Sequence, residues 1–292
     1  MPRIASSIAN QLRGMRAALA SVLFPAPCRI CGEMLDTGIR IPFCQGCLGD
    51  LAKPLPEPLC PQCGRPVVSS PVAQAIAAPH CHMCRLGAYD FDLARSYGAY
   101  TSSMARAVLL LKHHEVTPLG SWFAGMLARL VDCEPELFAA DAVVPVPLDV
   151  GRQRERGYNQ AELIARPLAR LLGIPFRSYL LVRTRPRPNQ LRLTRLERWV
   201  TVRGAYATHR KAQVDKLRVL LVDDVFTTGA TLDACSQALR RAGAVRVVGL
   251  TVARALPQVL NPEAAVNYRN HEIARPKRKT SPAEDPAGSS GR

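Results

Sequence analysis

Two adjacent acids followed by a hydroxyl-rich loop form the segment of this sequence best suited to chemistry. Residues 219–231 read as a short apolar run, then Asp223 and Asp224, and then Thr-Thr-Gly-Ala-Thr from Thr227 to Thr231. Backbone N–H groups that converge at a helix N-terminus bind phosphate, and a glycine in the loop permits a close approach. Adjacent carboxylates accept hydrogen bonds from vicinal sugar hydroxyls and hold hydrated Mg2+. A sugar phosphate satisfies both demands.

Four Cys-x-x-Cys pairs form a second chemical signature, within the first 84 residues. Two such pairs supply the tetrahedral sulfur shell that zinc prefers, and the gaps of 12 and 17 residues predict two closed, structural Zn2+ sites. Disulfides, an iron–sulfur cluster and an empty remnant are the alternatives, but the sequence lacks a convincing signal peptide, which favours metal. His80 and His82 flank Cys81 and are interpreted as non-ligands. The predicted metal ligands are Cys28, Cys31, Cys44, Cys47, Cys60, Cys63, Cys81 and Cys84.

The positive charge of the chain is concentrated in one region. The 292 residues contain 39 Lys and Arg against 23 Asp and Glu, a net charge of +16. Between Arg152 and Arg198, twelve Arg and three Glu leave a net charge of +9. Because the arginine fork matches phosphate geometry, this clustering indicates a phosphate-bearing partner, either a small molecule or a nucleic-acid backbone. The 48% content of hydrophobic residues excludes global disorder.

The elements that must position these residues alternate along the chain. Apolar periodicity predicts helices, and short apolar runs predict buried strands. Alternating strands and helices predict an α/β fold with a parallel sheet flanked by helices. The predicted helices are Met104–Lys112, Trp122–Leu130, Gln160–Leu172 and Thr231–Ala242, and the predicted strands are Asp141–Val146, Arg218–Val222 and Arg246–Val252.

The two ends of the chain are read from composition. Residues 1–24 combine arginines with apolar residues at helical spacing, which predicts an amphipathic basic helix in preference to a signal peptide. Whether this helix packs on the protein or lies at the inner membrane stays open, and no run of 18 apolar residues predicts a membrane span. We expect a cytoplasmic protein. Residues 259–292 predict a basic, disordered tail.

The sequence resembles one known family over about residues 22–256. Residues 219–231 look like the phosphoribosyl pyrophosphate (PRPP) signature of type I phosphoribosyltransferases. The four cysteine pairs extend the resemblance to the ComF competence-protein family, as do Val144–Pro147, Arg156–Gln160, the Gln190–Arg198 loop and Gly204–Tyr206. One departure is Thr201, where the family usually has Asn, so a ligand contact there is not assigned.

This resemblance implies a type I phosphoribosyltransferase-like domain at residues 89–258 behind a double zinc ribbon at 25–88. It also implies that PRPP binds with Mg2+, with Asp223 and Asp224 on the ribose hydroxyls and as the catalytic acids. Residues 183–198 would form a flexible loop over the site. The implied 5-phosphate ligands are Thr227, Thr228, Gly229, Ala230 and Thr231. The implied pyrophosphate contacts, near the loop after Pro147, are Lys112, Arg152, Arg154 and Arg156, although Lys112 also suits an exposed lysine that ends a helix.

Three functions remain open at this stage. The first is an enzyme that transfers a pentosyl group from PRPP, in DNA uptake during natural competence or in nucleotide metabolism. The second is a single-stranded-DNA-binding accessory of the DNA-import machinery, for which Tyr158 and Trp199 are the stacking candidates, each expected to be partly buried. The third is a PRPP sensor without turnover. No segment predicts a purine or pyrimidine pocket, so no acceptor is named.

Overall fold

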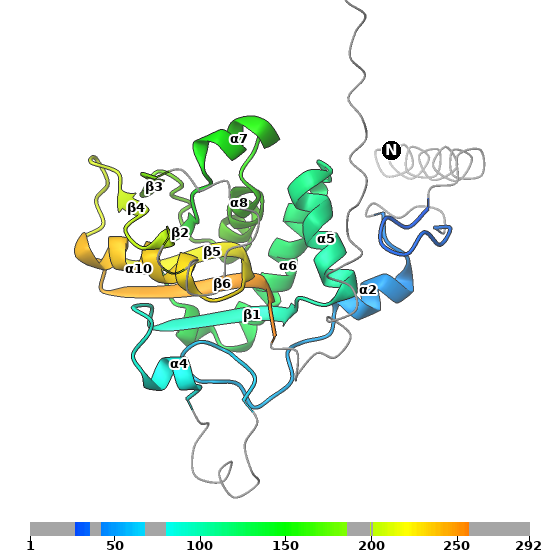
Figure 1. The fold of residues 1–292 in the computed structure, drawn as a ribbon, viewed down its shortest axis with the longest axis horizontal. Helices are drawn as coiled ribbons and strands as arrows, with labels where there is room; N and C mark the ends of the chain where they lie inside the picture. Colours follow the sequence, from blue (N-terminus) through cyan, green and yellow to red (C-terminus); the bar gives the residue numbers. More distant parts are fainter. Residues whose placement is uncertain (1–26, 36–41, 68–79, 186–198, 200, 257–292) are drawn as a thin grey trace, which may run out of the picture.

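The centre of the protein is a parallel sheet of four strands, described here from a computed structural model (Figure 1). The structure describes residues 27–35, 42–67, 80–185, 199 and 201–256. The strand order is β1-β6-β5-β2, and every neighbouring pair is parallel. A separate antiparallel pair joins β3 to β4. The strands are β1 Leu93–Ala99, β2 Ala142–Pro145, β3 Leu181–Arg183, β4 Tyr206–Thr208, β5 Arg218–Phe226 and β6 Arg246–Arg254.

Helices cover both faces of this sheet, as the buried runs in its strands require. Leu220 and Val222 of β5 belong to the core shared with α5, α6 and α8, whereas Val219 and Leu221 belong to the core shared with α10. This alternation follows from the two-residue period of a strand. The helices of the sheet domain are α5 Ser102–His113, α6 Pro118–Cys133, the 3-10 helix η1 Pro135–Phe138, α7 Val150–Arg156, α8 Gln160–Leu172 and α10 Ala230–Arg241.

The two cysteine ribbons belong to different cores. The first ribbon, with Cys28, Cys44 and Cys47, is buried in the core of α5 and α6, and its short helix α2 (Gln45–Leu51) lies at the edge of this layer (Figure 1). The second ribbon carries α4 (His82–Arg85), and its four cysteines share the core of β5 and α10 with Phe226. The ribbons are thus built into the packing of the sheet domain.

Most predicted elements are confirmed. Helix α8 has the predicted bounds, and the other three predicted helices differ from the observed ones by a few residues at their ends. The predicted strand at Arg218–Val222 is longer in the structure, because β5 continues through both acids to Phe226. The loop predicted at residues 183–198 begins inside β3, which ends at Arg183, and its residues 186–198 lie outside the described residues. The predicted N-terminal helix (residues 1–24) and basic tail (259–292) also lie outside the described residues.

One element was wrongly assigned as a loop. The segment after Pro147 forms α7, whose side chains are all at least partly exposed, so that it shows no apolar periodicity. Its ends are fixed by local chemistry instead. The carboxylate of Asp149 accepts hydrogen bonds from the N–H groups of Gly151 and Arg152, and Gly157 ends the helix in a left-handed conformation with φ 79°. Strand β1 was also missed, because arginine, serine and glycine interrupt its apolar pattern.

Candidate functional site

The two acids of the signature lie where β5 extends past its neighbour. Strand β2 pairs with β5 only as far as Val222, whereas β6 accompanies β5 to Phe226. Asp223 and Asp224 therefore stand at the carboxyl edge of the sheet, where parallel α/β folds bind ligands. The Asp223 carboxylate accepts a hydrogen bond of 2.8 Å from the N–H of Asp224.

Asp224 is a buried carboxylate with one oxygen available. Its side chain forms an ion pair with Lys112 at the end of α5, with 2.9 Å between Nζ and Oδ1. Asp224 is only 4% exposed, and within the described part of the chain its Oδ2 atom has no hydrogen-bond partner. A buried acceptor without a partner carries a desolvation penalty, which a ligand donor or a metal-bound water would remove. Carboxylate oxygens are also the ligands that Mg2+ takes, so this donor fits the implied ion.

The loop after the acids has the backbone geometry of an anion-binding loop at the N-terminus of α10. Gly229 has a φ of 86°, and a Cβ atom there would lie 2.6 Å from Tyr89 Cε1 and 2.7 Å from Phe226 Cζ. Only glycine fits this position. The Tyr89 hydroxyl donates a hydrogen bond of 2.9 Å to the Thr228 carbonyl. Among the hydrogen bonds of the described residues, none is donated by the N–H groups of residues 227–229, which leaves them available to a bound anion.

Basic side chains gather on the other side of the acids. Arg152 and Arg156 are half-buried and lie one helical turn apart on α7, whereas Arg154 is exposed and points to the opposite side of the helix. Burial and Arg152 lower the pKa of Arg156, while the nearby Asp224 raises it. Lys112 contacts Asp224, and the charges of Asp224 and Arg152 both act on Arg156, so these three cations and the acid form one group. Arg154 is not part of this group.

The pKa of His113 reflects the positive charge beside the two acids. Burial, together with the charges of Arg156, Lys112, His114 and Arg152, lowers its pKa from 6.5 to about 4. The imidazole is thus kept neutral near pH 7, first by its burial and then by the charges of Arg156 and Lys112. An anion bound among these cations would weaken this effect.

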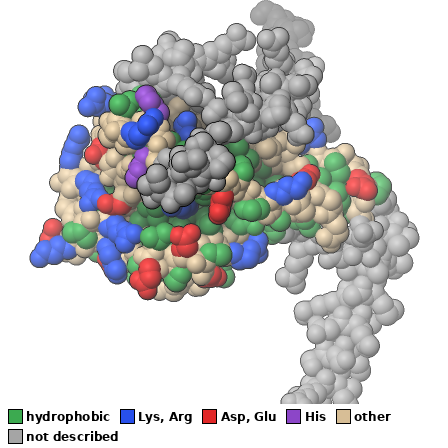
Figure 2. Space-filling view, turned by 90° about the horizontal axis from the view of Figure 1, so that it is seen from below, with side chains coloured by type: hydrophobic (Ala, Val, Ile, Leu, Met, Phe, Trp, Pro, Cys, Tyr) green, Lys and Arg blue, Asp and Glu red, His purple; other side chains and the backbone are tan. Residues whose placement is uncertain are grey.

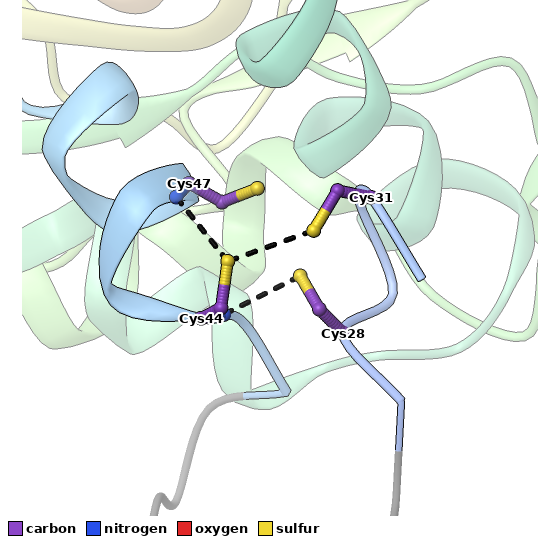
Figure 3. A group of neighbouring side chains, drawn as sticks. All are labelled: Cys28, Cys31, Cys44 and Cys47. Atoms are coloured by element: carbon purple, nitrogen blue, oxygen red, sulfur yellow. Dashed lines mark hydrogen bonds between the residues drawn. The ribbon is translucent and has the colours of Figure 1, made fainter. Parts of the chain in front are cut away.

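The eight cysteines of the pairs form two separate groups of four, Cys28/Cys31 with Cys44/Cys47 and Cys60/Cys63 with Cys81/Cys84. In each group the sulfur atoms lie within 4.8 Å of one another, and Figure 3 shows those of the first group facing a common centre. Neighbouring sulfur atoms are 3.6 Å apart in the first group and 3.5 Å apart in the second. Both groups fit a closed tetrahedral Zn2+ shell and hence a structural role. Neither His80 nor His82 belongs to a group.

The two groups differ in exposure. All four cysteines of the second ribbon are buried, whereas Cys31 of the first ribbon is exposed. Backbone N–H groups donate to sulfur in both: that of Cys44 to Cys28 and that of Cys81 to Cys60, each at 3.3 Å. This repeated geometry is the one expected for thiolates whose charge is partly stabilised by amides.

Comparison with known proteins identifies the family. Residues 19–85 match the double zinc ribbon domain, and residues 159–275 match the phosphoribosyl transferase domain. Competence protein F of Haemophilus influenzae is 30% identical over 73% of this chain and 90% of its own length. The chain belongs to the ComF competence-protein family. Further ComF relatives are the DNA utilization protein YhgH of Escherichia coli K12, 28% identical over 76% of this chain and 94% of its own, and competence protein ComFC of Bacillus subtilis, 26% identical over 72% and 83%.

Solved structures align with shorter stretches of this ComF protein. Glutamine PRPP amidotransferase from B. subtilis aligns at 25% identity and a TM-score of 0.31, over 45% of this chain and 26% of that enzyme. Purine phosphoribosyltransferase from Pyrococcus horikoshii aligns at 19% identity and a TM-score of 0.29, over 46% and 84%. Among the described residues, no helix is both long and apolar enough to cross a membrane.

Three residues near the ComF site were missed by the sequence analysis. Tyr89 and Arg254 contact the loop region from distant parts of the chain, and His113 follows Lys112 on α5.

The expectation for the stacking candidates Tyr158 and Trp199 is confirmed, since both rings are partly buried. The Tyr158 hydroxyl donates to the carbonyl of Leu111, and the ring of Trp199 lies 5.7 Å from that of Tyr89. Neither offers a freely exposed stacking platform.

Proposed function

We propose that this ComF protein binds PRPP with Mg2+ at the end of β5 and acts as a phosphoribosyltransferase-type protein of DNA uptake. The observation that carries the proposal is the buried, unpartnered Asp224 Oδ2 atom beside the open N–H groups before α10. A ribose 5-phosphate supplies both the missing hydroxyl donors and the anion. The names of the relatives, which refer to competence and DNA utilization, support the link to DNA uptake.

In this proposal each group of side chains has one task. Asp223 and Asp224 hold the ribose hydroxyls, and residues 227–231 bind the 5-phosphate. Lys112, Arg152 and Arg156 hold the pyrophosphate, where their charges favour its departure from the anomeric carbon. Mg2+, when bound, adds positive charge at the pyrophosphate. The protein thus contributes positioning and electrostatic stabilisation, and no covalent nucleophile is required.

Calorimetric titration of the zinc-loaded protein with PRPP tests this assignment. We expect micromolar binding in the presence of Mg2+ and much weaker binding in its absence. Ribose 5-phosphate serves as the matched ligand, because it retains contacts to the acids and the loop but lacks the pyrophosphate. Absence of PRPP binding with Mg2+ present would contradict the proposal.

Single-stranded DNA is the second candidate ligand, and the density of arginines between residues 152 and 198 favours it. Four of the twelve lie outside the described residues. On the face shown in Figure 2, the described basic side chains are interspersed with acidic ones, which gives no continuous track for a phosphate backbone there. DNA affinity that falls by several log units as salt is raised, without PRPP binding, would favour this function. PRPP binding without turnover would favour a sensor.

Ligand binding is expected to raise the pKa of His113. In the free protein this pKa is about 4, because burial and four neighbouring cations disfavour the charged imidazole. Pyrophosphate among these cations offsets their charge, so the imidazole should titrate closer to its ordinary value near 6.5. NMR titration of the histidine ring with and without PRPP and Mg2+ measures the change. The ring signals of His209, which lies outside this group of residues, serve as the control and should be unaffected by the ligand.

An unchanged pKa at His113 despite saturating PRPP would mean that the pyrophosphate does not lie beside α5 and α7. Arg154→Gln is the control for long-range charge, because it removes one charge from the exposed side of α7. This variant should leave the shift at His113 nearly intact. Arg156→Gln should reduce it.

A further inference from the structure

Arg254, the last residue of β6, is a buried cation beside the second cysteine ribbon. It is only 1% exposed. One guanidinium nitrogen donates a hydrogen bond of 2.7 Å to the Cys63 carbonyl, and another donates to the Cys63 sulfur atom at 3.5 Å. The guanidinium carbon lies 3.9 Å from the centre of the Phe226 ring. Burial of an arginine is costly unless an opposite charge compensates it.

The described side chains offer this arginine no carboxylate. The ion pairs found in the described part of the chain all involve other residues. The negative charge beside Arg254 is that of the cysteines, because four thiolates around one Zn2+ carry a net charge of about −2. Hydrogen bonds and cations around such a shell stabilise it and orient its ligands.

We propose that Arg254 is the counter-ion of the second zinc site and, through Phe226, the positioning residue that ties this site to the phosphate-binding loop. The zinc ion and the arginine then depend on each other. Zinc loading compensates the buried guanidinium, and the guanidinium stabilises the thiolate shell. The second ribbon thereby holds the loop of residues 227–229 in position.

The contacts from Arg254 to the loop are continuous. The ring of Phe226 lies between the guanidinium and Gly229, whose missing side chain leaves room for this ring. The Tyr89 ring packs edge-on against Phe226 at 6.2 Å, and its hydroxyl holds the Thr228 carbonyl. Tyr89 also follows the last cysteine of the second ribbon by five residues. Movement of this ribbon would therefore be transmitted to the loop along two routes.

Among the described residues, the first ribbon shows no equivalent arrangement. Its cysteines pack in the core of α5 and α6, on the other side of the sheet from the core that contains Phe226. Its nearby arginine, Arg106, is exposed and donates to a backbone carbonyl, that of Ile30. Arg106 therefore serves as the matched control for Arg254.

Zinc affinity, measured for each site by competition with a chelator in the full-length protein, tests the proposal. Cadmium NMR of the substituted protein distinguishes the two sulfur shells. Arg254→Met should weaken metal binding at the second site by about 10- to 100-fold and leave the first site unchanged. Arg254→Lys, which keeps the charge, should recover part of the loss. Arg106→Met should leave the second site at its wild-type affinity.

Amide hydrogen exchange at Ala230 and Asp233, whose N–H groups donate to the Thr228 hydroxyl and the Gly229 carbonyl, measures the connection to the loop without any ligand. Exchange should become faster in Arg254→Met and on selective zinc loss from the second site. Tyr89→Phe should also raise exchange at the loop while metal affinity stays at the wild-type value. Loop exchange that stays unchanged when the second site is empty would overturn the positioning role.

Equal weakening of both zinc sites, or a second-site affinity within about twofold of wild type, would overturn the counter-ion role. Should Arg254→Met fail to fold, the same comparison is made with Arg254→Lys. Selective weakening of the second site relative to wild type in that variant supports the proposal, and an equal change at both sites or an unchanged second site refutes it. An arginine with a purely structural role would, when replaced, lower the stability of the protein without a selective loss of zinc affinity at the second site.

Discussion

Asp224→Asn is expected to weaken Mg2+-dependent PRPP binding by at least about 100-fold. The substitution removes the negative charge that the ribose hydroxyls and the ion require, and it places an amide donor where an acceptor is needed. It also leaves Lys112 without its ion-pair partner at 2.9 Å. Calorimetric titration of the zinc-loaded variant with PRPP measures the loss, and circular dichroism verifies the fold.

Asp141→Asn is the matched control for this substitution. Asp141 also pairs with a basic residue, Arg218. This pair lies at the amino end of β5, whereas the loop follows the carboxyl end of the same strand. This variant should retain wild-type PRPP affinity. Single-stranded-DNA affinity should be unchanged in both variants. An Asp224→Asn protein that still binds PRPP tightly would refute the assignment, and an equal loss of DNA affinity would mean that the two ligands share one site.

The parts of the site that could be predicted from sequence are those whose chemistry is local. In residues 219–231 the strand, the acids, the loop and the helix start are consecutive, so one segment contains both the backbone geometry and the ligand groups. The cysteine spacing is local in the same sense. Gaps of 12 and 17 residues predict two shells of four but leave open which motifs share a shell, and the structure groups neighbouring pairs.

The parts that could not be predicted depend on contacts between distant residues. Arg254 reaches Cys63 across 191 positions, and Tyr89 reaches Thr228 across 139. Neither residue lies in a sequence motif, because the role of each depends on contacts that exist only in the folded protein. The role of Lys112 stayed open for the same reason, since its partner Asp224 is on another element. Helix α7 was missed because capping residues, and not an apolar face, define it.

Cys60→Ser is expected to lower the Tm by about 10 °C or more, because it opens the shell of the fully buried second ribbon. Loss of this ion would leave three thiols and the Arg254 guanidinium buried without compensation, within the core that supports β5 and α10. The loss of stability therefore reaches the sheet itself. Calorimetric unfolding, together with zinc content, measures it.

Cys31→Ser makes the same chemical change in the first ribbon, and its effect on Tm should be clearly smaller. Cys31 is exposed, so water can solvate a serine there and the remaining ligands with little loss of packing. No buried arginine among the described residues contacts this ribbon's sulfur atoms, so its zinc loss creates no comparable uncompensated charge. Equal Tm losses in the two variants would mean that each zinc ion stabilises only its own ribbon. A larger loss for Cys60→Ser, with faster exchange at Ala230 and Asp233, would show that the second zinc ion stabilises the loop of residues 227–229 as well.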